Sequence, residues 1–172
     1  SFATWQYQRR VQMHWQAILP AALCGLAGSF AGAWAVTQMS PHFLRKALPL
    51  VLVLILLYTL VKKDLGRHHA PRFSGHKEVI AASLIGGCIG LYDGFFGPGT
   101  GSFLVFLFVR VLGYDFLHAS AGAKLVNVFT NIAAIALFAS KGHVWWHLGL
   151  VMAVANVAGS VMGSRMAIKH GA

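Results

Sequence analysis

The sequence predicts an all-α fold, a multi-pass bundle of transmembrane helices. Of its 172 residues 57% are hydrophobic and 10% are charged, whereas globular proteins average roughly 45–50% and 25%. A helix needs roughly 20 apolar residues to cross the bilayer core, so this length allows at most about six spans. Fourteen Lys and Arg against four Asp and Glu indicate cationic loops beside anionic lipid. We therefore expect a lipid bilayer as partner and no nucleic acid.

The first two expected spans cover residues 17–36 and 47–61. The first contains no charged residue and is long enough to cross a bilayer. The second reaches only about 22 Å as a helix, but a basic pair on each side of it can extend to both interfaces. The loop that follows, 62–78, is rich in Lys, Arg and His, so the positive-inside rule predicts that it lies in the cytoplasm.

Residues 79–113 contain two apolar stretches on either side of the insert DGFFGPGTG. The stretches 79–92 and 102–113 are about 21 Å and 18 Å long as helices, too short to cross alone. They form one broken span or a hairpin of two half-helices, since irregular backbone is tolerated at membrane depth where protein or water surrounds it. A hairpin places ten Lys and Arg inside, three outside and Lys124 within a span, whereas a broken span gives eight against five. The charge count favours the hairpin.

The last two expected spans cover residues 119–139 and 148–168. The first carries Lys124, Asn127, Thr130 and Asn131 within a largely apolar run, and the second has Asn156 in its interior. The connection between them, SKGHVWWH, contains two tryptophans, which are typical of a membrane interface and are expected on the outer side.

An internal repeat supports a two-part organisation of the single membrane domain, 1–172. With Trp15 aligned on Trp146, the motif AGSFAG at 27–32 matches AGSVMG at 158–163. Transporters are commonly built from such repeats. We therefore assign 1–61 to the end of a first repeat and 79–172 to a second. The counterpart of the Gly-rich insert is then expected before residue 1, so we expect a chain truncated at its N-terminus.

No motif in the sequence indicates an enzyme, a cofactor site or a metal site. There is no HExxH, P-loop or nucleophile elbow. Cys24 and Cys88 lie in apolar runs without CxxC spacing, which is typical of small apolar filler. His143 and His147 have metal-compatible spacing, but amphipathic rings are expected in an interfacial turn in any case. We therefore predict no catalytic residue, no cofactor and no bound metal.

The insert and the next span contain the polar residues that remain open to two interpretations. A second half-helix that begins near 100–102 would present free N–H groups to an anion, or Thr100 or Ser102 would simply cap it. Asp93 is a carrier of a coupling proton or an Asx-turn residue. Lys124 points inward at an anion or extends to the interface. Asn127 and Asn131 share its helix face and either line a pore or join helices.

Three segments of the chain resemble a known family of membrane proteins. They are GLYDGFFGPGTGSFLVFLF (90–108), ASAGAKLVNVFTN (119–131) and FASKGHVWWHLGLVMAVANVAGSVMGSRMA (138–167), and they are similar to the second half of the sulfite exporter TauE/SafE family. The resemblance implies a transporter of the bacterial inner membrane with about eight spans in two repeats. Its expected cargo is a small anion, often sulfur-containing, such as sulfite, thiosulfate or a sulfonate.

We accordingly expect anion transport by alternating access, with an anion channel or a non-transporting scaffold as the alternatives. A homo-oligomer is compatible with all three functions. The motif positions, together with Thr100 at the expected start of the half-helix, give the predicted substrate-binding residues. These are Asp93, Gly94, Phe95, Gly97, Pro98, Gly99, Thr100, Gly101, Lys124, Asn127 and Asn131.

Overall fold

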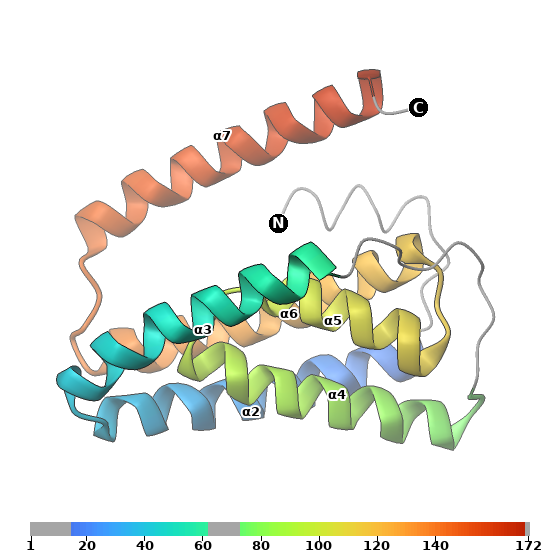
Figure 1. Ribbon diagram of the computed structural model, residues 1–172, viewed down its shortest axis with the longest axis horizontal. Helices are drawn as coiled ribbons and strands as arrows, with labels where there is room; N and C mark the ends of the chain where they lie inside the picture. The colour runs from blue at the N-terminus through green and yellow to red at the C-terminus, as the bar shows by residue number, and fades with distance from the viewer. Residues whose placement is uncertain (1–14, 62–72, 171–172) are drawn as a thin grey trace.

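The computed structural model describes residues 15–61 and 73–170, which form six α-helices and one short π-helix (Figure 1). Three of these helices, α2, α4 and α6, are long and apolar enough to cross a membrane. The predicted all-α membrane fold is confirmed, while most of the loop expected in the cytoplasm lies outside the described residues. The elements are α2 (Trp15–Gln38), α3 (Pro41–Val61), α4 (His76–Phe95), α5 (Thr100–Leu107), η1 (Phe108–Leu112), α6 (Phe116–Ser140) and α7 (Trp146–His170).

Glycines bring α2 and α4 into direct backbone contact. A Cβ atom added to Gly86 would lie 2.1 Å from the carbonyl oxygen of Ala21, and one added to Gly94 would lie 2.0 Å from that of Ser29. Gly86, Gly90 and Gly94 are four residues apart and therefore share one helix face. Small residues at this spacing let membrane helices approach closely. The GxxxG pairs of α4 thus serve helix packing.

The third helix of the core, α6, packs against α2 from another side. The Ser29 hydroxyl donates a hydrogen bond of 2.7 Å to the backbone carbonyl of Thr130, and both residues are buried. Ile18, Phe108 and Val126 are fully buried and belong to one continuous apolar cluster. The core of the described residues therefore lies between α2, α4 and α6, with η1 closing it.

The Gly-rich segment is a hairpin, as the charge count predicts. After the turn at 96–99, α5 and η1 run back along α4 (Figure 1). The hydroxyl of Tyr114, which follows η1, donates a hydrogen bond to the carboxylate of Glu78 in the first turn of α4. The chain therefore returns to the end of the molecule where α4 began.

The expectation of two half-helices is wrong for the first arm. At 20 residues, α4 is about 30 Å long, because the residues DGF continue the helix rather than break it. The reason lies in packing: Gly94 sits against the backbone of Ser29, so contact with α2 offsets its poor helix propensity. Only α5 with η1 is a short arm.

From its level along α2 we infer that the turn of the hairpin lies at membrane depth. Gly94 is level with Ser29 and Ala33 of α2, and α2 continues beyond them to Gln38. A Cβ atom on Gly99 would lie 3.0 Å from the Ile55 side chain, and Ile55 is near the middle of the apolar stretch of α3. Irregular backbone at this depth requires surrounding protein, which α2 and α3 provide.

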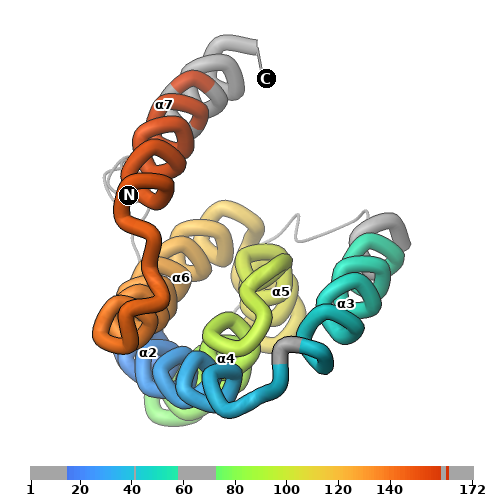
Figure 2. The backbone as a smooth tube through the Cα atoms, turned by 90° about the vertical axis from the view of Figure 1, so that its left-hand side faces the viewer, coloured from blue at the N-terminus to red at the C-terminus, as the bar shows by residue number. Residues whose placement is uncertain are grey.

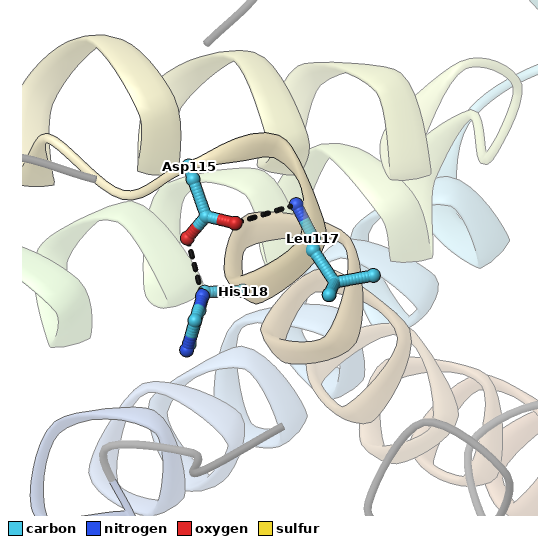
Figure 3. A network of polar contacts seen from close by, with 3 residues as sticks. All are labelled: Asp115, Leu117 and His118. Carbon is cyan, nitrogen blue, oxygen red and sulfur yellow. Dashed lines mark hydrogen bonds and ion pairs between the residues drawn. The ribbon is translucent and has the colours of Figure 1, made fainter. Parts of the chain in front are cut away.

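The start of α6 is fixed by its own side chains (Figure 3). Asp115 is the N-cap residue and accepts a hydrogen bond of 3.2 Å from the backbone N–H of Leu117. Its second carboxylate oxygen contacts Nδ1 of His118. Burial, followed by the hydrogen bond and the charge of Glu78, raises the pKa of the adjacent Tyr114 hydroxyl above its ordinary value. Tyr114 is therefore a neutral donor that ties the start of α6 to α4.

The last helix, α7, lies apart from the other helices (Figures 1 and 2). Every side chain of α7 that the structure describes is exposed. The connection between α6 and α7 is held at the C-terminal end of α2, where Lys141 Nζ donates a hydrogen bond of 2.9 Å to Thr37 Oγ1. The exposed apolar side chains of α7 are suited to lipid or to another helix.

Candidate functional site

Two glycines with left-handed backbone conformations make the hairpin turn. Gly97 and Gly99 have φ angles of 85° and 81°, which a residue with a Cβ adopts only with strain. Gly99 is the N-cap residue of α5, without a side-chain cap, so neither Thr100 nor Ser102 has the capping role that we considered. The first amides of α5 bond instead to turn carbonyls: Thr100 N–H donates to Gly97 and Phe103 N–H to Gly99.

The side chain of Asp93 reaches across the turn. Asp93 lies within the last turn of α4, so it is not the Asx-turn residue of the sequence interpretation. Its Oδ1 atom lies 2.6 Å from the hydroxyl oxygen of Thr100, and this same hydroxyl lies 2.7 Å from the backbone carbonyl oxygen of Gly97. Thr100 is only 2% exposed, whereas Asp93 is half-buried.

Aromatic rings pack around this turn. The Tyr92 hydroxyl donates a hydrogen bond of 2.7 Å to the carbonyl oxygen of Pro98. The Tyr92 ring packs edge-on against Phe103 of α5, and Phe95 packs against Phe96 with ring centroids 4.6 Å apart. The residues of the Gly-rich motif before Gly101 therefore shape and support the turn.

A cavity of about 730 Å³ lies between α5, α6 and α7. Four predicted substrate-binding residues line it: Gly101 from the first turn of α5, and Lys124, Asn127 and Asn131 from one face of α6. Among the described residues that line the cavity, Lys124 is the one charged group and none is acidic. The other lining residues are Ser102, Val105, Ser120, Ala123, Val128, Ile132, Ile135 and Asn156.

The two asparagines of α6 are held in a defined arrangement. Asn131 Nδ2 donates to the backbone carbonyl of Asn127 at 2.6 Å and also to its side-chain Oδ1. Because Oδ1 of Asn127 accepts this bond, the Nδ2 group of Asn127 is left to face α5. A Cβ atom on Gly101 would lie 3.8 Å from it. The face of the cavity beside α5 is thus lined by N–H donors and a lysine.

The structure divides the predicted residues into two groups. Gly101, Lys124, Asn127 and Asn131 meet in the cavity. The other seven form the turn or flank it at the ends of α4 and α5, with Gly94 packed on α2, and do not line the cavity. They are Asp93, Gly94, Phe95, Gly97, Pro98, Gly99 and Thr100.

Three polar residues of the cavity were not among the predicted site residues. Ser102 and Ser120 face it from α5 and α6, and Asn156 reaches it from α7. The sequence does mark Asn156 as a functional candidate, since it is a polar residue in an apolar span. Its connection to Lys124, however, follows only from the position of α7 near α6 in the structure.

Other parts of the described chain are less suited to an anion or a metal. A second hollow of about 580 Å³ is lined by Trp15, His76 and Glu78 among others, and the Glu78 carboxylate there opposes a negative ligand. His143 and His147 are exposed, and no cluster of three or more metal-binding side chains occurs among the described residues.

Comparison with known proteins gives a consistent picture. Residues 1–172 match the family described as sulfite exporter TauE/SafE. The "Probable membrane transporter protein YfcA" of Escherichia coli K12 is 40% identical over 144 residues, which are 84% of this chain and 53% of that protein.

Two further relatives carry similar names. The Sinorhizobium "Probable membrane transporter protein ORF9" is 36% identical over 99% of this chain and 64% of its own length. A "Probable membrane transporter protein" of Haemophilus influenzae is 33% identical over 84% of this chain and 56% of its own length. The chain thus spans about half to two thirds of the length of these relatives. No solved structure matches it.

Proposed function

Because the chain belongs to the sulfite exporter TauE/SafE family, we propose that it is the anion-binding part of a membrane transporter. One observation carries the proposal: the cavity between α5, α6 and α7 presents Lys124 and the amide of Asn127 and is lined by no acidic residue that the structure describes. The ligand class is a small anion, and the family description favours oxyanions of sulfur. The bacterial relatives support a place in the bacterial inner membrane and a non-enzymatic role.

The lysine is needed because the other features of the site are too weak to extract an anion from water. A helix N-terminus contributes roughly 0.3–1 kcal/mol at exposed sites and up to about 2 kcal/mol when partly buried. The desolvation of an ion costs far more. A full positive charge beside fixed N–H donors offsets this cost, and charge-assisted hydrogen bonds are about twice as strong as neutral ones.

The hairpin favours a mechanism of alternating access rather than a permanently open pore. Discontinuous helices whose N-termini meet near the bilayer midplane are typical of carriers. The turn at 96–99 lies at membrane depth, and the cavity begins directly after it at Gly101. Movement of the α4–α5 hairpin against α6 would change the access to such a site.

The first experiment measures anion binding by the full chain in nanodiscs with Lys124→Gln. We expect the affinity for sulfite and thiosulfate to fall about 10-fold to 100-fold, the range that corresponds to losing a hydrogen bond to a charged group. Lys124→Arg keeps the charge and should retain part of the affinity.

The matched control is Lys141→Gln, which removes a lysine at the far end of the same helix, where it bonds Thr37. If Lys124→Gln binds like the unchanged chain, the cavity is not the anion site. Counterflow in proteoliposomes tests the mechanism, since a carrier accelerates labelled anion uptake when unlabelled anion is trapped inside, whereas a channel does not.

A further inference from the structure

The hydroxyl of Thr100 is the starting point, because it has more acceptors than protons. Its oxygen lies within hydrogen-bond distance of Asp93 Oδ1 (2.6 Å) and of the Gly97 carbonyl oxygen (2.7 Å). A threonine hydroxyl has a single proton, while a carboxylate and a carbonyl have none to donate. If Asp93 were ionised, one hydrogen would have to serve two short contacts.

A proton on Asp93 resolves this arrangement. A protonated carboxyl group donates one hydrogen bond, so Asp93 donates to the Thr100 oxygen while Thr100 donates to Gly97. Each of the two short contacts then has its own hydrogen. The surroundings agree, since the turn lies at membrane depth, where an ionised carboxylate is costly.

We propose that Asp93 is a proton-carrying residue that couples proton movement to the anion cavity through the first turn of α5. The coupling to anion transport rests on the proposed function, whereas the presence of a proton on Asp93 does not depend on it. The path is short: Thr100 is the first residue of α5 and Gly101, the next residue, lines the cavity.

Loss of the proton changes the hydrogen bonds of the turn in a defined way. The O–H bond of Asp93 breaks, the proton passes to water at the half-buried carboxyl group, and the electron pair stays on the carboxylate. The Thr100 hydrogen then turns from the Gly97 carbonyl to Asp93. Gly97 keeps only the long 3.4 Å bond from the Thr100 amide, so the left-handed turn before α5 is loosened.

Other charged groups near the turn are few among the described residues. Tyr92 is the titratable neighbour on α4, and Lys124 faces α5 from α6. α2 has no charged residue. The basic residues of α3 and Arg110 of η1 are nine or more residues along their helices from Ile55 and Thr100 respectively, about 13 Å or more at 1.5 Å per residue.

Infrared spectroscopy of the chain in nanodiscs tests the proton directly, without any anion or transport. We expect a carbonyl stretch of a protonated carboxylic acid. Asp93→Asn should remove this band, and Thr100→Val, which keeps the shape but removes the acceptor, should shift it. Asp115→Asn is the matched control, an acid at a helix N-terminus, and should leave the band unchanged.

Transport then tests the coupling. A sulfonate is the probe, because a sulfonate stays ionised whether the pH is neutral or alkaline. An imposed pH gradient should accelerate uptake by the unchanged chain in proteoliposomes, and Asp93→Asn should abolish this response. Absence of an infrared band that Asp93→Asn removes would overturn the proposal. A band without any effect of the gradient on an active transporter would overturn the coupling.

The two proposals fail separately. If the band is present but Lys124→Gln has no effect on anion binding, the proton site stands and the anion site falls. If Lys124→Gln abolishes binding but no band is found, the reverse holds.

Discussion

The helices α2 and α7 carry the same small-residue motif, AGSxxG, but have opposite surroundings. Trp15 and Trp146, the first residues of the two helices, are similarly exposed at 48% and 58%. At the motif itself the copies differ: a Cβ atom on Gly28 of α2 would lie 2.3 Å from the Gly87 carbonyl oxygen, whereas one on the equivalent Gly159 of α7 would meet nothing within 4 Å.

This difference teaches that small residues permit close packing but do not produce it. Ser29 and Gly32 of the α2 motif are buried because α4 presents glycines at the same four-residue spacing, so the two backbones fit together. In the described part of the chain no second helix of this kind faces α7. A small-residue motif therefore needs a partner helix with a matching face.

The largest expected effect comes from adding a side chain to the same motif position in each helix. Gly28→Val should destabilise the chain by about 3 kcal/mol or more, because the clash is with backbone and cannot relax by a rotamer change. Gly159→Val should change stability by less than about 0.5 kcal/mol. Unfolding in detergent, followed by circular dichroism, measures both. Equal losses in the two variants would show that α7 is packed as tightly as α2.

A smaller effect is expected for the hydrogen bond that joins α2 to α6. Ser29→Ala removes the hydroxyl that donates from α2 to the buried Thr130 carbonyl of α6, and we expect a loss of about 0.5–1.5 kcal/mol, the net contribution of one intramolecular hydrogen bond. Ser140→Ala is the matched control. Its hydroxyl bonds within its own helix, to Leu137, so its removal should cost less than about 0.5 kcal/mol. A similar cost for both would mean that the contact between α2 and α6 adds nothing specific.

The smallest effect is expected where α7 departs from α2. In the repeat register Asn156 stands in the place of Gly25, which packs against α4 and α6, and it lines the cavity instead. Asn156→Ala should leave stability unchanged and weaken anion binding by about 2-fold to 10-fold, the range of one neutral hydrogen bond. Isothermal titration with thiosulfate measures the affinity. A loss of stability with unchanged affinity would assign α7 a packing role.

The cavity could be predicted in part from the sequence, because Lys124, Asn127 and Asn131 share a helix face by the period of the α-helix alone. Their place beside Gly101 also follows from a hairpin that the charge distribution favours. Asn156 could not be linked to them in the same way. Its distance from Lys124 depends on how two helices lie in space, and no local pattern carries that information.

The sequence by itself determined the class of the protein and the approximate extent of most helices, and its charge count favoured the hairpin over a broken span, since apolar length and basic flanks report directly on solvation by lipid. Only the tertiary structure decided what the glycines and Asp93 do. Gly94 reads locally as a helix breaker but continues α4, because packing on Ser29 outweighs its propensity. Asp93 reads as a turn former but bonds Thr100, seven residues on, because a reversal of the chain brings their side chains together.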